Sequence, residues 1–185
     1  GQADWEKILE KTLPYVDFFV PSIEELCFMI DREKFDELQV RAEGGDITDV
    51  LNIEQDIKPL AKKCMEMGCK VLLLKCGAKG MYLQTAEEKV LEKISPKTEI
   101  SADEWAGKEI FEKSYVPEKI LSGTGAGDTS IAAFLTSMLG GESPEMCLHL
   151  AAATGASCVA AYDALSGLKS LEELKRKIGE GWEKV

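Results

Sequence analysis

The feature that most constrains the fold is a helical pattern followed closely by a short, uninterrupted apolar strand. Apolar residues recur at helical spacing from Ile57 to Met67, Gly68 ends that pattern, and Val71–Leu74 is apolar at every position. A strand that is apolar on both faces is typical of a sheet that helices cover on both sides. This unit therefore predicts an α/β fold.

A second unit nearer the N-terminus leads from a strand into a helix. Val16–Val20 is rich in β-prone residues, and Pro21 follows it directly. Ser22 and Glu25 then have the spacing of a capping box, which marks the start of a helix. Two such units favour an α/β domain.

The other segments are predicted in less detail. A charged stretch from Asp31 to Asn52 is expected to be flexible or to form a small helical insertion. Short strands are expected at Met81–Leu83 and Val90–Leu91, and residues 95–119 are expected to be irregular with one or two strands. Further helices are expected over residues 4–13, from the glycine-rich loop to residue 139, from 143 to about 161, and from 170 onward.

Length and charge limit the possible partners. A chain of 185 residues fits one domain. Its 33 acidic and 22 basic residues give a net charge of −11, which repels phosphate backbones and anionic lipids. Neither nucleic acid nor a membrane surface is an expected partner. The apolar runs are also far shorter than the roughly 20 residues that span a bilayer.

The cysteines and the single histidine bear on compartment and metal binding. The six cysteines form no Cys-x-x-Cys pair and occupy mostly apolar positions, as buried free thiols do. No basic and apolar secretory signal is visible at the N-terminus, so a reducing, cytoplasmic location is predicted. His149 is the only histidine, which argues against a zinc site with histidine and cysteine ligands.

The strongest candidate site is a glycine-rich loop at residues 123–128, with the sequence Gly-Thr-Gly-Ala-Gly-Asp. Its glycines let successive amides turn toward one point, and the helix that follows adds a partial positive charge. The loop matches neither the Walker A pattern nor the dinucleotide-binding Gly-x-Gly-x-x-Gly. From these residues alone, a phosphate site and an ordinary turn with Asp128 complementing the helix dipole both stay open.

Four ordered segments resemble ribokinase-like (PfkB) carbohydrate kinases. Residues 122–135, SGTGAGDTSIAAFL, resemble the C-terminal signature of that family. Residues 21–25 resemble its Pro-Asn-x-x-Glu element, 72–80 its strand ending in Gly-x-x-Gly, and 150–159 its Ala-rich helix beside adenine. The resemblance implies that residues 1–185 form a single three-layer α/β domain with a largely parallel sheet flanked by helices. This domain would be the C-terminal ATP-binding portion of a sugar kinase, without the N-terminal substrate and lid half.

The resemblance also implies catalytic roles. Asp128 would be the base that takes the proton from the acceptor hydroxyl, and the amides of Gly125, Ala126 and Gly127 would form an anion hole. Glu25 would organise the Mg²⁺ of Mg-ATP through water. The family's asparagine is replaced by Ser22, so a purely capping role for Glu25 is the alternative.

The nucleotide would be bound by residues from three segments, and each has a structural alternative. The implied set is Lys75, Gly77, Gly80, Thr124, Ala152, Gly155 and Ala156. Lys75 would contact a phosphate or point to solvent, and the three small residues near 155 would leave room for adenine or allow close helix packing. Ser122 stands where many members have an aspartate near a monovalent cation, which leaves that cation's role open.

The resemblance implies transfer of the γ-phosphate of ATP, with Mg²⁺, to a hydroxyl of a small sugar or sugar acid. The alternatives are a vitamin or nucleoside kinase of the same fold and a non-catalytic nucleotide-binding regulatory module. These 185 residues alone are expected to be inactive, and a homodimer is an option for the full-length protein.

Overall fold

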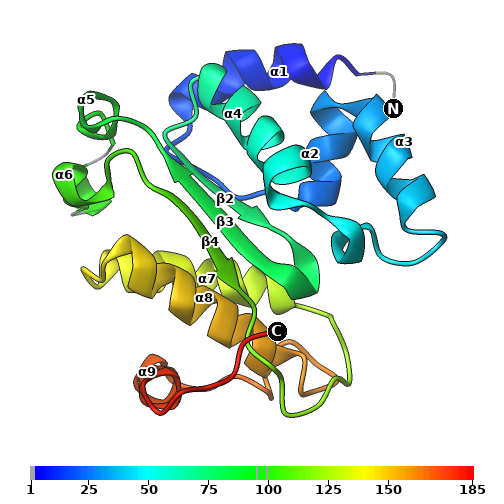
Figure 1. Cartoon of the computed structure of the whole chain (residues 1–185). Helices are drawn as coiled ribbons and strands as arrows, with labels where there is room; N and C mark the ends of the chain where they lie inside the picture. Colours follow the sequence, from blue (N-terminus) through cyan, green and yellow to red (C-terminus); the bar gives the residue numbers. More distant parts are fainter. Residues whose placement is uncertain (1–2, 95, 99) are drawn as a thin grey trace.

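A sheet lies between two groups of helices (Figure 1). The computed structural model describes residues 3–94, 96–98 and 100–185. One helical layer consists of α1 (Trp5–Thr12), α2 (Ile23–Ile30), α3 (Arg32–Arg41) and α4 (Lys58–Glu66). The opposite layer consists of α7 (Ala126–Leu139), α8 (Pro144–Cys158) and α9 (Leu171–Gly179), while α5 (Glu88–Leu91) and α6 (Ala102–Trp105) are short. The three-layer α/β prediction is confirmed.

The sheet is mixed, with four strands in the order β1-β2-β3-β4. The strands are β1 (Phe18–Phe19), β2 (Val71–Lys75), β3 (Gly80–Thr85) and β4 (Glu109–Lys113). Within the described residues, only β1 and β2 pair in parallel, and the other two pairs are antiparallel. The prediction of a largely parallel sheet therefore fails for this chain, because the turn between β2 and β3 is too short for a helical crossover.

The continuous apolar run of β2 is buried on both faces. Leu72 and Leu74 belong to a core with helices α1, α2 and α4, whereas Val71 and Leu73 pack with α7 and α8. Successive side chains of a strand point to opposite faces, so one strand supplies two cores. This is the packing that the sequence predicts.

The predicted helix starts are present in detail. In α2, the Glu25 amide donates to the Ser22 hydroxyl at 3.1 Å, and the Ser22 amide donates to the Glu25 carboxylate at 2.9 Å. This completes a capping box. Asp4 caps α1 and Ser143 caps α8, each with its side chain accepting from a backbone amide of the first turn.

Three expectations about the connecting segments can be compared with the structure. The stretch from Asp31 to Asn52 contains α3, so its helical interpretation is confirmed, and Arg41 binds the buried Asp56 there at 3.1 Å. Val90–Leu91 is a turn of α5 and not a strand, because the neighbouring sheet position is taken by β4. Residues 95–119 contain one strand, with 95 and 99 outside the described residues.

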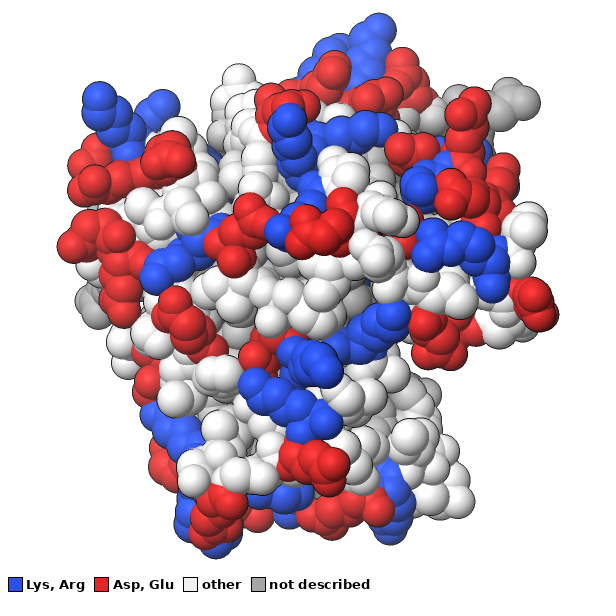
Figure 2. Space-filling view, in the orientation of Figure 1, with Lys and Arg blue, Asp and Glu red and all other residues white. Residues whose placement is uncertain are grey.

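The surface and the cysteines agree with the compositional analysis. All six cysteines are buried free thiols. Figure 2 shows acidic and basic side chains interspersed over the face viewed. Among the described residues, no helix combines the length and apolar character needed to cross a bilayer.

Candidate functional site

Three segments that are distant in sequence meet at the carboxyl end of β2. Lys75 ends that strand and forms a parallel bridge with Ser22, and its amide donates to the Pro21 carbonyl at 3.1 Å. The Lys75 side chain reaches the first turn of α7, where its Nζ lies 3.4 Å from the position of a Cβ built on Gly127. The carboxyl ends of strands are where α/β sheets bind ligands. The fold thus brings together three predicted parts of the site: the segment of Ser22 and Glu25, Lys75, and the glycine-rich start of α7.

The start of α7 is shaped by Gly125. This residue caps the helix with φ +79°, and a side chain there would collide with Ala164. Among the described residues, no carbonyl accepts a hydrogen bond from the amides of Gly125 and Gly127. The Ala126 amide differs from the prediction, because it donates to the Gly123 carbonyl at 3.2 Å and closes the turn.

Asp128 lies in the first turn of α7 and is exposed. Within the part of the chain that the structure describes, no hydrogen bond or salt bridge engages its carboxylate. Thr124 is also exposed, and its amide donates to the Ser122 hydroxyl at 3.1 Å. The loop therefore presents a carboxylate without a described partner beside two open amides.

Glu25 is exposed and has one carboxylate oxygen held by the Ser22 amide. That hydrogen bond lowers the pKa of Glu25, and the positive charge of Lys75 adds to the effect. No group of three or more potential ligands that could hold a metal exists among the described residues. Magnesium, however, keeps much of its water and commonly uses one or two carboxylates together with substrate phosphates. A lone ionised Glu25 fits that water-mediated role.

Gly77 and Gly80 shape the turn between β2 and β3. Gly77 has φ +58°, and a side chain there would collide with the buried Thr48. Gly80 is buried with φ +129° and lies against the backbone of β4 at Glu112. The Lys79 ammonium fixes the same turn by donating to the Leu51 carbonyl at 2.6 Å. Packing alone thus requires glycine at both positions.

A pocket of about 210 Å³ lies beside α8. It is lined by Glu118, Lys119, Ala156, Ser157, Ala160, Ser166, Gly167, Leu168, Lys169, Lys177 and Trp182. Of the three small residues predicted to face adenine, only Ala156 lines it. Ala152 is buried in a core with Leu174 of α9, and Gly155 faces α7, where a Cβ would lie 2.6 Å from the Ser130 hydroxyl. These two residues lie away from the pocket because α8 packs against both helices.

One loop connects this pocket to the start of α7. Ala164 lies against Gly125, while Ser166 and Gly167 line the pocket. The Cys158 thiol contacts the carbonyls of Thr124 and Ala164, each at 3.6 Å. The pocket and the open amides are therefore neighbouring parts of one surface.

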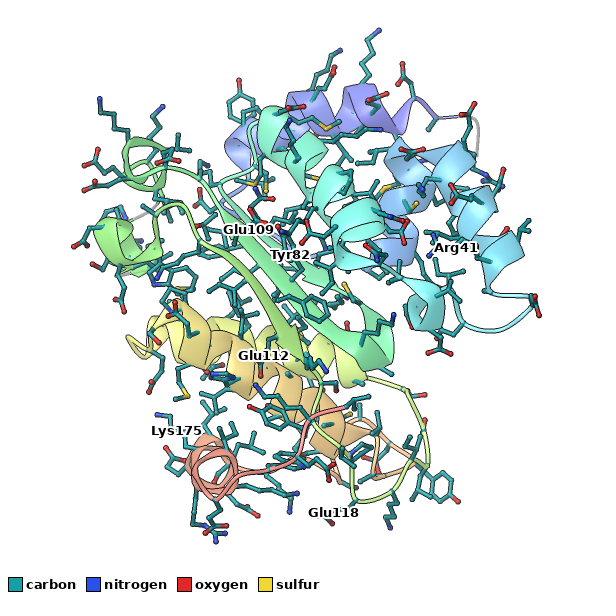
Figure 3. All side chains as sticks on the ribbon, viewed as in Figure 1. Arg41, Tyr82, Glu109, Glu112, Glu118 and Lys175 are labelled. Carbon is teal, nitrogen blue, oxygen red and sulfur yellow. The ribbon has the colours of Figure 1, made fainter. Side chains whose placement is uncertain are left out.

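The C-terminal segment forms a pocket wall that the sequence did not predict. Trp182 donates from its indole nitrogen to the Val116 carbonyl at 2.7 Å. The buried carboxylate of Glu112, which lies on β4 next to α8 (Figure 3), binds Lys184 at 2.7 Å and His149 at 2.8 Å. The one available signal was a tryptophan in an otherwise charged segment, which does not indicate what it packs against.

Comparison with known proteins identifies the family. The model of the pfkB family carbohydrate kinases matches residues 2–170. An uncharacterized sugar kinase from Archaeoglobus fulgidus is 25% identical over 168 residues, which cover 91% of this chain and 48% of that protein.

Two solved structures share the fold. Arabidopsis thaliana ribokinase, complexed with ribose and ATP, has a TM-score of 0.62 at 24% identity and is matched over 90% of this chain and 42% of its own. A putative ribokinase II from E. coli, in complex with ATP and Mg²⁺, has a TM-score of 0.60 at 20% identity, over 94% and 42%. This chain spans about half the length of the curated sugar kinase. On the match over residues 2–170, the chain belongs to the pfkB family of carbohydrate kinases.

Proposed function

We propose that this chain is the ATP-binding portion of a kinase that transfers the γ-phosphate of ATP to a hydroxyl of a small sugar or sugar acid. The observation that carries the proposal is the meeting of Glu25, Lys75 and the start of α7 at one end of β2, in a member of the pfkB family. The pocket of about 210 Å³ beside Ala156 adjoins these residues and is the proposed place of the nucleoside. Bound ATP would thus direct its phosphates toward Gly125 and Gly127.

The chain's residues support this chemistry by position and charge. Phosphoryl transfer proceeds through a loose transition state, which proteins stabilise mainly by alignment and electrostatics. The amides of Gly125 and Gly127 would stabilise the transferring phosphoryl group, and Asp128 would accept the proton of the attacking hydroxyl. Glu25 would hold Mg²⁺ through water, and that ion would neutralise phosphate charge.

The function is tested with the full-length protein. Incubation with Mg-ATP and a panel of neutral sugars, sugar acids, nucleosides and vitamins is expected to give a phosphorylated sugar or sugar acid. A product from a nucleoside or vitamin alone would place the protein in that other kinase class. ATP binding without transfer to any acceptor would instead support a regulatory module. We further propose a cytoplasmic location, which the six buried thiols support.

These 185 residues are expected to bind ATP weakly and to show negligible turnover of any sugar. The chain spans about half the length of its curated relative, so it would lack groups that position the acceptor and exclude water. Calorimetric titration with ATP and a coupled ADP-release assay measure the two properties. Robust sugar phosphorylation by this chain alone would contradict the expectation.

Glu25→Gln is expected to weaken the Mg²⁺-dependent activity of the full-length enzyme while leaving the fold intact. The amide oxygen of glutamine can still accept from Ser22, so the cap survives, whereas the charge that attracts the hydrated ion is lost. Activity is measured across a Mg²⁺ titration. Glu24→Gln is the matched control, because it removes the neighbouring exposed charge. If the variant required the same Mg²⁺ concentration as wild type, Glu25 would have no role in binding the ion and would act only as part of the helix cap.

A further inference from the structure

The pocket beside α8 is small for a nucleoside. Its volume is about 210 Å³, whereas pockets that hold small molecules usually measure roughly 300–1,000 Å³. Glu118, Lys177 and Trp182 are among its lining residues. Lys177 pairs with Glu118 at 3.1 Å, so an ion pair between two lining residues connects α9 to the segment after β4. Part of the lining must therefore move before a nucleoside fits.

Residues 182–185 form a short strap that carries one of these lining side chains. The strap runs from α9 back to the segment after β4 (Figure 1), where Lys184 forms an antiparallel bridge with Tyr115. In the described part of the chain, two backbone hydrogen bonds of 2.9 Å, from the amides of Val116 and Val185, join the strap to that segment. The last three residues of the strap are exposed. A segment with so few buried contacts opens at a low cost in free energy.

An ion pair with a buried carboxylate anchors the strap. Glu112 is buried on β4, and its Oε1 lies 2.7 Å from the Lys184 ammonium group. The same oxygen lies 2.8 Å from Nδ1 of His149, on α8. A buried carboxylate is costly without a partner. Because His149 does not belong to the strap, the carboxylate keeps one hydrogen-bond partner when the strap leaves, and opening isolates no buried charge.

The indole of Trp182 is engaged by side chains of the protein itself. The centroids of the Trp182 and Tyr115 rings are 4.9 Å apart, and Nζ of Lys177 lies 3.7 Å from the centre of the indole. An aromatic ring and a cation are both favourable neighbours of an indole. These contacts hold Trp182 in the pocket wall, and they favour a role in closing the pocket over a role in stacking on a bound base.

We propose that the strap is a gate: Trp182 keeps the pocket too small for a nucleoside until the strap opens, and the ligand binds the open form. This inference rests on the proposed function for the identity of the ligand as ATP. When only a fraction of the molecules can bind, the apparent affinity falls by that fraction. Trp182 is therefore expected to weaken nucleotide binding although it lines the pocket, which is the opposite of what a residue in contact with the ligand would do.

Calorimetric titration of this chain with ATP and Mg²⁺ compares wild type with Trp182→Ala and Lys184→Gln. The first variant removes the side chain that fills the space, and the second removes the anchor but no lining residue. Both are expected to bind ATP more tightly, by about tenfold if the open form makes up about a tenth of wild type. Tyr15→Ala is the matched control, because it removes an exposed aromatic ring next to α1 and should bind as wild type does. Thermal unfolding verifies that the variants are folded.

Hydrogen exchange at the Val116 amide reports opening of the strap directly. This amide donates to the Glu183 carbonyl only while the strap is closed. Lys184→Gln is expected to accelerate its exchange by about tenfold, the usual size of a hydrogen bond to a charged group. Saturating ATP is expected to accelerate the same exchange in wild type, because it binds the open form.

The outcomes separate this inference from the proposed function. Weaker or unchanged ATP binding by either variant would overturn the gate, and so would exchange at Val116 that ATP does not accelerate. No ATP binding by wild type and both variants would overturn it as well. None of these readouts depends on phosphoryl transfer. Tighter binding by both variants with faster exchange would support the gate even if the full-length protein transfers phosphate to no acceptor.

Discussion

Asp128→Asn is expected to lower the turnover of the full-length enzyme by roughly 10²–10⁴-fold, the usual contribution of a general base. Asparagine keeps the size of the side chain but cannot take the proton of the acceptor hydroxyl. No described residue holds the Asp128 carboxylate, so its loss breaks no contact within the structure. The effect should therefore fall on kcat, and the fold should be unaffected.

ATP affinity is the second readout for this variant. It should change little, because the open amides of Gly125 and Gly127 belong to the backbone and remain. Asp36→Asn, on the exposed side of α3, is the control for loss of an acidic charge. Near-normal turnover would refute the assignment of Asp128 as the base. Loss of both turnover and ATP binding would indicate a disrupted loop.

Gly80→Ala is expected to destabilise the protein by at least about 3 kcal/mol, through strain and overpacking together. A methyl group there would lie well inside contact distance of the Glu112 carbonyl oxygen on β4. The backbone of Gly80 also has φ +129°, which side chains rarely allow. Strand β4 would have to move away from β3, although Gly80 and Lys113 are paired in the sheet.

Denaturant unfolding of this chain measures that change. Gly44→Ala is the matched control: it also has positive φ, +88°, but no atom lies within 4 Å of its added Cβ. Its expected cost is about 1 kcal/mol, from the backbone conformation alone. The difference between the two variants isolates the collision with β4. Equal free energies of unfolding would show that β4 accommodates the methyl group.

The sequence predicts those parts of the fold that depend on local pattern. The capping box at Ser22 and Glu25 follows from spacing, and burial of Val71–Leu74 on both faces follows from composition. The direction of strand pairing cannot be predicted from local pattern. It depends on the length of the connection between two strands and on which segment occupies the neighbouring position in the sheet. Val90–Leu91 shows this limit, since its apolar pair suits a strand but lies in a short helix.

The candidate site could be predicted only where a motif lies in one continuous segment. Asp128 and its glycines stand in such a segment, and so does Glu25. The pocket beside α8 could not be predicted, because Glu118, Ala156 and Trp182 come from three separate segments. Likewise, Ala152, Gly155 and Ala156 are all small residues of one helix, and the sequence does not distinguish them. Contacts with α9 and α7 direct Ala152 and Gly155 away from the pocket that Ala156 lines.

The parallel pairing of β1 with β2 has a consequence for folding kinetics. Strands β2, β3 and β4 form neighbouring antiparallel pairs, with only a short turn between the first two. The pair of β1 and β2, in contrast, joins Phe18 to Val71 and must close a long loop, which costs more chain entropy. Glu25 lies in α2, directly after β1, and Lys75 ends β2, so the pairing of these two strands brings the two side chains near each other. We therefore expect this strand pair to form late in folding. Local opening of β1 is expected to separate the two charged groups while the antiparallel strands remain paired.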